Sequence, residues 1–448
     1  MSQRAESGPL GRVFDEFVKW LMDRLERTPL MAFRFQVPRV FVSPFGYLGM
    51  LTAITFLILG ITGALLMFYY RPDIELAYDS VKEIEENVEF GFFLRNIHYH
   101  ASNMMVLLAL AHMFYQFFSG RFKVRNEILW VTGVILGTLT ILEAFTGYDL
   151  ILNQRAMLAV NIAGGLTFST PFVGESLAAI LLGGGLYDLV LRFYALHVFI
   201  LPMVMLLLVG VHFPRFLVFD PPMVSATIGS ILVVAGLFPV ELGPKYSPTA
   251  ALIEVPEWYL TGLYAFIRTG LDRFIAGALL PLLFILAFLV VPFVDKSKKL
   301  SWRDRPFFTA FGITSIVLIA VTTVWGFYTV PGVPAFDAVY IEPMVFWPVL
   351  LILTAATFGI SYKFVASPGK QAKPPTRGRP IVIQIPYEWD VRIIMALLAL
   401  IAFLALLSFQ YYLDGLKNIA LFNLGVVLMI FGLIAHLYRH AMQQISRR

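Results

Sequence analysis

The chain has 448 residues, of which 58% are hydrophobic and only 14% are charged, against about 25% charged residues in ordinary soluble domains. This composition excludes a cytosolic enzyme, a disordered protein and a secreted disulfide scaffold, because too few polar side chains are present to cover a water-soluble molecule. The net charge of +5 comes without a dense basic stripe, which favours basic loops beside a lipid membrane and argues against nucleic acid as a partner.

The first 40 residues contain no apolar core of a signal peptide, and their pattern predicts an amphipathic helix on the inner membrane surface over Val13–Leu25. A bilayer core of about 30 Å needs about 20 apolar residues per helix. Ten runs meet this need, namely Tyr47–Tyr70, Ile97–Phe118, Ile128–Leu150, Phe193–Leu217, Met223–Val240, Gly277–Val294, Phe307–Tyr328, Pro343–Tyr362, Val391–Tyr411 and Ile419–Tyr438. The partly apolar stretch Asn153–Asp188 is predicted to form short surface helices and no crossing.

Charges between these runs alternate as the positive-inside rule requires. Basic residues gather before Phe41, in the second–third, sixth–seventh and eighth–ninth loops and at the C-terminus. The first–second loop is acidic, and the seventh–eighth loop has no Lys or Arg. We therefore expect an all-α polytopic protein of the cell membrane, with about ten transmembrane helices and both termini in the cytoplasm.

Five of the seven histidines lie in two of the predicted spans, and four of these five form two regularly spaced pairs. His98 and His112 are 14 residues apart in the second span, and His197 and His212 are 15 apart in the fourth. At about 100° and 1.5 Å per residue, each pair stays roughly on one face of its helix, about 21–22 Å apart. Because the two spans run in the same direction, His98 is predicted to face His197 near the outer side, and His112 to face His212 near the inner side. Each facing pair can hold one iron from both axial sides, as in six-coordinate haems.

One intramembrane histidine is more often a structural or proton-relay residue than a metal ligand. Two pairs of nearly equal spacing in parallel spans reverse that expectation. His100 lies about 200° around the helix from His98 and is predicted to be structural. His436 and His440 lie at the inner end of the tenth span and are predicted to be interfacial.

Glycines in the first and third spans match the histidine spacing. Gly49 and Gly63 are 14 residues apart, and so are Gly133 and Gly147. Small residues allow close approach of neighbouring groups, so these four are predicted to make room for the flat haem.

Two arginines stand at the outer ends of the spans that carry the histidines. Arg95 is three residues before His98, and Arg192 is five before His197. Either could anchor its helix at the membrane interface. Because both would lie beside the same haem, they are predicted to bind its anionic propionates.

These motifs resemble cytochrome b of the quinol–cytochrome c reductase (Rieske–cytochrome b) family. The second span reads Arg95-Asn96-Ile97-His98, and the third ends Thr146-Gly147-Tyr148. The most specific match is Pro256-Glu257-Trp258-Tyr259, followed by Ile267-Arg268-Thr269, which resembles the outer quinol-oxidation loop of the family. The resemblance runs from about Phe41 to Tyr362. The 15-residue histidine spacing is similar to the plastoquinol–plastocyanin reductase branch, but both halves are fused here in one chain.

The chain departs from the family pattern at three places. Asp149-Leu150-Ile151 follow Tyr148, where the family usually has Leu-Pro-Trp. Tyr115 stands where the family often has a basic propionate partner, for which Arg121 and Lys123 are the alternatives. Tyr47 matches the position where the plastoquinol branch attaches an extra haem through cysteine, and a chain without cysteine excludes that covalent haem.

The resemblance implies two non-covalent haems, with b-type haem expected, whose iron ligands are His98 with His197 and His112 with His212. It also implies oxidation of quinol at an outer site, where Glu257 accepts a proton and Tyr259 hydrogen-bonds Glu257 or the substrate. One electron then crosses through both haems to a quinone on the inner side, which contributes to the proton-motive force. The candidates for that inner site are Arg215 and Asp220.

The implied partners are a Rieske iron–sulfur protein, a c-type cytochrome or other electron acceptor, and a second copy of the chain. The iron–sulfur protein must be a separate chain, because this one has no cysteine. The predicted domains are an inner-surface segment (1–40), a four-helix dihaem domain (41–220), a C-terminal domain with the quinol-oxidation loop (221–366), a Pro- and Lys-rich linker (367–390) and an additional two-helix hairpin (391–448).

Two other functions share some of these features. A dihaem, quinone-reactive anchor of a formate dehydrogenase or hydrogenase would have histidine pairs, and a transporter could use the histidines as proton relays. Neither needs the Pro-Glu-Trp-Tyr sequence.

Overall fold

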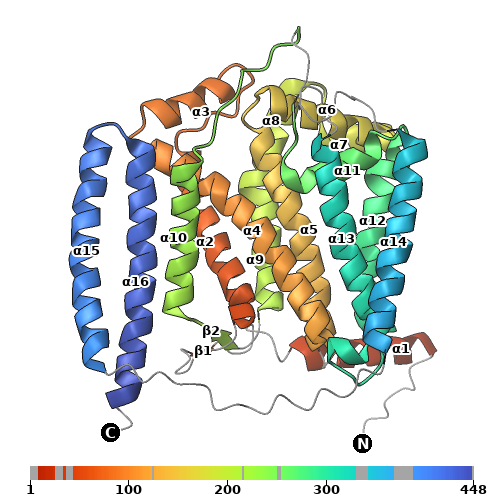
Figure 1. Cartoon of the computed structure of the whole chain (residues 1–448). Helices are drawn as coiled ribbons and strands as arrows, with labels where there is room; N and C mark the ends of the chain where they lie inside the picture. Colours follow the sequence, from red (N-terminus) through yellow and green to blue (C-terminus); the bar gives the residue numbers. More distant parts are fainter. Residues whose placement is uncertain are drawn as a thin grey trace, which may run out of the picture.

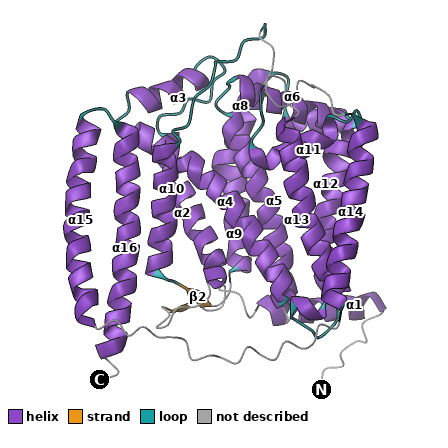
Figure 2. Cartoon of the chain, in the orientation of Figure 1, coloured by secondary structure: helices purple, strands orange, loops and turns teal. Residues whose placement is uncertain are grey.

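The computed structural model describes residues 9–25, 34–36, 44–123, 126–213, 216–249, 254–328, 342–367 and 387–445. Helices dominate these residues (Figure 2). The only named strands in them are two three-residue segments, β1 (Arg34–Gln36) and β2 (Phe216–Val218), which pair in parallel. The predicted all-α polytopic fold is therefore confirmed, with this small ribbon as an addition that the sequence did not indicate.

Long helices stand side by side in the N-terminal half, and shorter ones lie at both ends of them (Figure 1). The long helices are α2 (Leu48–Met67), α4 (Gly91–Ser119), α5 (Glu127–Asp149) and the continuous run α8 (Leu186–Ala195), η3 (Leu196–Ile200) and α9 (Leu201–His212). The shorter ones are α1 (Pro9–Leu25), η1 (Pro44–Tyr47), α3 (Ala77–Glu86), η2 (Arg121–Lys123), α6 (Gln154–Phe168) and α7 (Gly174–Leu181). The stretch Asn153–Asp188 thus forms short helices, as predicted.

The C-terminal half adds six long helices and the short α11, beside which the loop carrying Glu257 lies. Its elements are α10 (Pro221–Leu237), α11 (Trp258–Ile267), η4 (Ile275–Leu279), α12 (Leu280–Val294), η5 (Trp302–Asp304), α13 (Pro306–Tyr328), α14 (Pro343–Ala366), α15 (Tyr387–Leu413) and α16 (Lys417–Ile445). Because α15 begins at Tyr387, the last residues of the predicted linker are helical. Residues 368–386 of that linker lie outside the described part of the chain.

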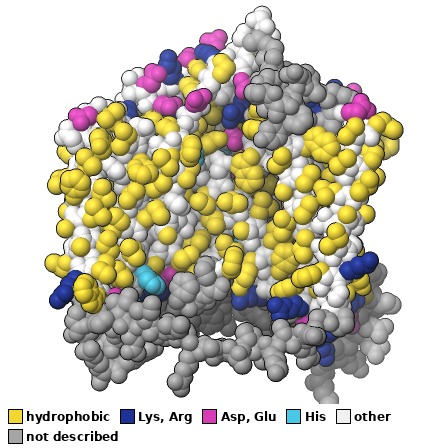
Figure 3. All heavy atoms as spheres, viewed as in Figure 1, with side chains coloured by type: hydrophobic (Ala, Val, Ile, Leu, Met, Phe, Trp, Pro, Cys, Tyr) yellow, Lys and Arg dark blue, Asp and Glu magenta, His cyan; other side chains and the backbone are white. Residues whose placement is uncertain are grey.

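Nine helical runs among the described residues are long and apolar enough to cross a membrane. The fifth predicted span is shorter than expected: α10 has 17 residues and stands upright between α2 and α16 (Figure 1). Apolar side chains form a belt around the visible face, and charged side chains lie above and below it (Figure 3). A belt of this kind matches a surface that faces lipid.

The C-terminal hairpin packs directly on the rest of the fold. Gly236 of α10 lies so close to α16 that an added Cβ would be 2.5 Å from the backbone nitrogen of Phe422. Gly425 of α16 makes a matching approach to Val233, at 2.6 Å. Small residues on both helices allow this close crossing, which is a common way for helices to associate in membranes. An ion pair between Asp220 and Arg439 joins the same two helices at one end.

Candidate functional site

His98, His112, His197 and His212 meet in the two predicted pairs. The ring centres of His98 and His197, here called the outer pair, are 6.3 Å apart, and their planes cross at 82°. The ring centres of His112 and His212, the inner pair, are 6.2 Å apart at 85°. Two metal–nitrogen bonds of about 2 Å, plus about 1 Å from each nitrogen to its ring centre, also give about 6 Å. The separations therefore fit one iron between each pair of rings.

A π-helical turn explains why one histidine spacing is 14 and the other 15. α4 is a regular α-helix between His98 and His112, whereas η3 is a π-helix that contains His197. A π-turn accommodates one extra residue, so His197 and His212 keep nearly the same phase as the other pair. Pro202, at the start of α9, lacks the N–H that a regular helix would use there. The offset of +60° expected from a uniform helix thereby becomes about −40°, which is the offset between His98 and His112.

Each of the four predicted glycines lies against one imidazole. A Cβ built on them would approach Cε1 of the histidine ring within 2.4–3.2 Å. The contacts are Gly49 with His112 (2.9 Å), Gly63 with His98 (3.2 Å), Gly133 with His212 (2.7 Å) and Gly147 with His197 (2.4 Å). The glycines thus make room for the histidine rings themselves, a more specific role than the general clearance for a haem that the spacing suggested.

Hydrogen bonds at Nδ1 orient three of the four rings. His197 donates from Nδ1 to the backbone oxygen of Glu143 (3.0 Å), and His212 donates to that of Leu129 (2.8 Å). Thr62 Oγ1 lies 2.9 Å from Nδ1 of His98 and donates its own proton to the oxygen of Ile58. A proton held on Nδ1 leaves the lone pair on Nε2, which is the tautomer that ligates a metal through Nε2.

The fit to haem also agrees with the number of ligands at each pair. Among the described residues, no three side chains of the types His, Cys, Asp or Glu gather in a way that could hold a bare metal ion. Two axial nitrogens are sufficient when a porphyrin supplies the other four ligands. The donor set present at each pair therefore fits haem.

Valine at Gly147 is expected to remove the outer haem, because its Cβ would lie 2.4 Å from Cε1 of His197. Overpacking of this kind costs about 1–3 kcal/mol and displaces the ring. The measurement is the reduced-minus-oxidised spectrum of the Gly147→Val protein. The control is Gly60→Val, since Gly60 is exposed and a Cβ there meets nothing within 4 Å. Equal haem content in both variants would contradict the packing argument.

The two arginines predicted to bind propionates have other contacts in this structure. Arg95 is buried, forms an ion pair with Glu85 and donates to the backbone oxygen of Val240 at 2.8 Å. Arg192 donates to the backbone oxygens of Ala179 and Ile180. Their role as propionate partners stays a prediction.

Lys123 and Arg121, the two alternatives for a cation near the inner pair, make different contacts. Lys123 forms an ion pair with buried Asp295 and donates to the backbone oxygen of Lys299 at 3.0 Å. Burial is the main reason that the pKa of Lys123 is lowered. Arg121 instead lies over the ring of Tyr115, 5.4 Å from its centre, and is close enough to His112 to act on it electrostatically. Arg121 is therefore the better placed of the two.

Glu257 is buried, with 6% of its side chain exposed. Although it is the N-cap residue of α11, its side chain makes no capping hydrogen bond. Instead, the hydroxyl of Tyr99 donates to its Oε2 at 3.1 Å, and Arg155 donates to its Oε1 at 3.0 Å. The alternative of an ordinary helix-capping glutamate is thus not supported by its contacts.

Arg155 and Tyr259 complete the surroundings of this carboxylate. Burial lowers the pKa of Arg155, but the charge of Glu257 outweighs it, and the pKa is raised overall. Burial, followed by the charge of Glu257, raises the pKa of Tyr259 well above its usual value. Arg155 therefore stays cationic and Tyr259 stays a neutral hydroxyl. The side chain of Arg155 is 40% exposed, so it connects the buried carboxylate with the surface.

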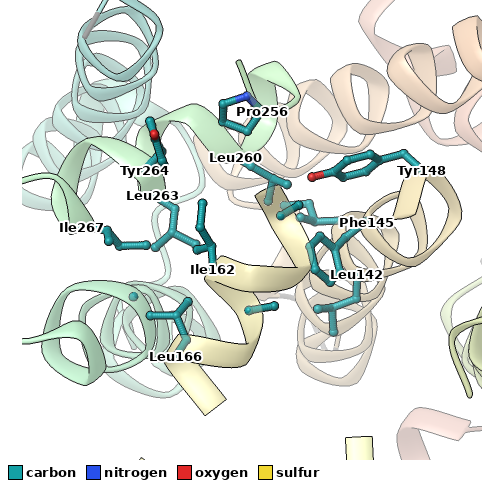
Figure 4. Close-up of a pocket in the computed structure, with 14 residues that line it drawn as sticks. Leu142, Phe145, Tyr148, Ile162, Leu166, Pro256, Leu260, Leu263, Tyr264 and Ile267 are labelled. Atoms are coloured by element: carbon teal, nitrogen blue, oxygen red, sulfur yellow. The ribbon is translucent and has the colours of Figure 1, made fainter. Parts of the chain in front are cut away.

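An apolar cavity of about 250 Å³ lies between α5, α6, α11 and η4; Pro256, the residue before Glu257, lines it, and Glu257 itself is not among the lining residues. The hydroxyl of Tyr148 points toward the cavity (Figure 4). Tyr148 directly follows Gly147, so adjacent residues of α5 contact the cavity and the outer pair. The remaining lining is almost entirely aliphatic or aromatic, as in Leu142, Phe145, Ile162, Leu166, Leu260 and Leu263. The cavity suits a flat, apolar ring with few polar groups.

Sequence reasoning missed several residues of this site. Tyr99 is one position past His98, and Arg155 lies in a stretch predicted only as surface helix, so no spacing pointed to either. Asp149 was noted as a departure from the family pattern. It is 1% exposed, and neither of its carboxylate oxygens has a hydrogen-bond partner within the described residues.

The inner quinone candidates are less defined. Arg215 lies outside the described residues. Asp220 is buried and forms its ion pair with Arg439 of α16, a helix beyond the region of family resemblance. Its role at an inner quinone site stays a prediction.

Comparison with known proteins identifies the family. Residues 35–218 match the family model described as cytochrome b/b6/petB, and residues 247–341 match the one described as cytochrome b (C-terminal)/b6/petD. Cytochrome b6 of Synechococcus sp. (strain JA-3-3Ab) is 39% identical over 209 residues, which cover 46% of this chain and 94% of that protein. Cytochrome b6 of Porphyra purpurea is 38% identical over 211 residues, with 46% and 94% covered.

A solved structure described as a hyperthermophilic respiratory complex III contains a similar chain. It is 25% identical with a TM-score of 0.57, and the match covers 79% of this chain and 98% of that one. The b6 relatives cover 46% of this chain, whereas the two family models match in succession along it. The chain therefore belongs to the cytochrome b/b6 family of membrane proteins, with the N-terminal and C-terminal parts joined in one polypeptide.

Proposed function

We propose that this chain is the dihaem cytochrome b of a Rieske–cytochrome b respiratory complex, which oxidises quinol at an outer site and passes one electron across the membrane to an inner quinone. The observation that carries this proposal is the arrangement on α5. Gly147 contacts His197 of the outer pair, and the next residue, Tyr148, lines the cavity that Pro256 also lines. A substrate in the cavity would therefore be adjacent to the outer pair through Tyr148 and Gly147, and to Glu257, the proposed proton acceptor, through Pro256.

Quinol oxidation releases two electrons and two protons, and different side chains of the site have different roles in it. The apolar lining holds the ring and excludes water. Glu257 accepts a proton from the quinol hydroxyl, while Tyr99 and Arg155 hold its carboxylate in place. Because Arg155 reaches the surface, it marks the direction in which that proton leaves.

His98 with His197 and His112 with His212 would hold the two haems, with Arg95 and Arg192 as candidate propionate partners on the outer side. When bound, the haems would supply one-electron transfer along the direction of the helices. Moving one charge across a membrane potential costs about 2.3 kcal/mol per 100 mV, which is how redox energy contributes to the proton-motive force.

The partners follow from what the chain lacks and from its relatives. A chain without cysteine cannot hold the iron–sulfur cluster that takes the other electron. A separate Rieske protein, a c-type cytochrome or other acceptor, and a second copy of this chain are the expected partners. The similar chain in a respiratory complex III supports this assembly. We place the complex in the cell membrane with both termini in the cytoplasm.

Reduced-minus-oxidised difference spectra of the purified complex test the proposal. Two b-type haems per chain are expected, both released by acid acetone because no cysteine can attach them. Absence of any b-type band would reject the proposal and favour a haem-free transporter. Two haems without quinol oxidation, in a complex that retains its iron–sulfur protein, would favour the dihaem anchor of another oxidoreductase.

A further inference from the structure

The two histidine pairs differ in what their Nδ1 atoms contact. A threonine precedes the contacting glycine at three of the four histidines, as Thr62-Gly63 with His98, Thr132-Gly133 with His212 and Thr146-Gly147 with His197. Each of these hydroxyls lies 2.9–3.4 Å from the Nδ1 atom of its histidine. The fourth glycine, Gly49, follows Leu48, which has no hydroxyl. Nδ1 of His112 is buried and has no hydrogen-bond partner within the described residues.

His197 of the outer pair has an additional acceptor beside its Nδ1 atom, the carboxyl group of Glu143. Oε1 of Glu143, an acidic residue inside the membrane, lies 3.2 Å from its Nδ1, besides the backbone oxygen of Glu143 at 3.0 Å. Ionisable residues are rare inside membranes and are by default functional there. Quinol oxidation as derived above makes no use of Glu143. One outer ligand thus has the strongest acceptor nearby, and one inner ligand has none.

A hydrogen bond from Nδ1–H to an acceptor makes imidazole a stronger electron donor through Nε2. A stronger donor stabilises the oxidised metal and makes its reduction harder, and second-shell hydrogen bonds of this kind are one way in which proteins tune haem. The carboxyl oxygen and the backbone oxygen beside His197 are therefore expected to lower the midpoint potential of the outer haem. The absence of an acceptor at His112 is expected to leave the midpoint potential of the inner haem higher.

We propose that Glu143 and Leu48 are potential-determining residues: Glu143 lowers the midpoint potential of the outer haem through His197, and Leu48 raises that of the inner haem by leaving His112 without an acceptor. Both residues are positioning residues, because they act through the ligands. The proposal rests on the proposed function, since it requires a haem at each pair.

Redox titration of the two haem bands tests this proposal on the intact complex. Glu143→Gln keeps the size of the side chain but weakens the acceptor, and is expected to raise the midpoint potential of the outer haem only. Leu48→Thr supplies the missing hydroxyl and is expected to lower that of the inner haem only. Leu48→Val is the matched control, because it has the shape of threonine without the hydroxyl, and it should leave both potentials unchanged.

The results separate this inference from the proposed function. Complexes that retain two haem bands, with unchanged midpoints in both Glu143→Gln and Leu48→Thr, would overturn the inference and leave the function standing. A shift in Leu48→Val equal to that in Leu48→Thr would show that packing, and not the hydroxyl, sets the potential, and would also overturn it. A wild-type complex without two haem bands would instead remove the function on which the inference rests.

Discussion

Replacing His98 by alanine is expected to abolish the outer haem band of the complex while the inner band remains, and His112→Ala is expected to do the reverse. The physical reason is that each imidazole supplies one of only two axial bonds, and its ring faces a single partner at 6.3 Å or 6.2 Å. The two pairs share no ligand, so each loss should be confined to one band. Difference spectra recorded at increasing potential distinguish the two bands.

His100→Ala is the matched control for His98→Ala. Its Nε2 atom lies 2.8 Å from the backbone oxygen of Phe238, so this ring is held against the end of α10. We expect both bands to remain when it is removed. Loss of both bands in His98→Ala, or of one band in His100→Ala, would contradict the assignment of ligands.

Glutamine at Glu257 is expected to slow quinol oxidation by about 10²- to 10⁴-fold, the usual contribution of a positioned general base, with both haems still bound. Glutamine keeps the volume of the side chain and can still accept the hydrogen bond from Tyr99, but it cannot take up a proton. The measurement is steady-state quinol oxidation by the complex, together with its haem content.

The control for Glu257→Gln is Glu254→Gln, which makes the same chemical change three residues earlier, outside the Pro-Glu-Trp-Tyr sequence. It should oxidise quinol at the wild-type rate. Equal rates in Glu257→Gln and the wild type would remove Glu257 from its proposed role. Equal slowing in both variants would indicate a general effect of charge near the loop.

The pairing of the histidines was predictable because it depends on helix geometry and on membrane topology, both of which the sequence carries directly. The angle between His197 and His212 around the helix axis was not predictable. A uniform helix leaves His212 about 60° ahead of His197, and only the π-turn at Leu196–Ile200 gives this pair the same offset, about −40°, as His98 and His112. Which residues adopt a π-turn depends on how the helix packs, so spacing alone could not show it.

At the outer pocket, too, the sequence predicted the motif but not the residues that contact it. The motif that contains Glu257 was recognisable, yet its partners Tyr99 and Arg155 are 158 and 102 residues away in the chain. No periodicity connects such distant positions. The contacts of Arg95 with Glu85 and Val240 could not be predicted either, because they depend on how α3 and the segment after α10 fold over the end of α4.

Local sequence features were sufficient to predict a bundle of membrane helices, with two histidine pairs and four glycines at matching depth. Those features follow from local apolar length and from a fixed rise per residue. The packed helices were needed to show which glycine contacts which ring, which Nδ1 atom has an acceptor and which cation forms an ion pair with Glu257. These depend on the rotation and closeness of neighbouring helices, which are set by packing between distant segments.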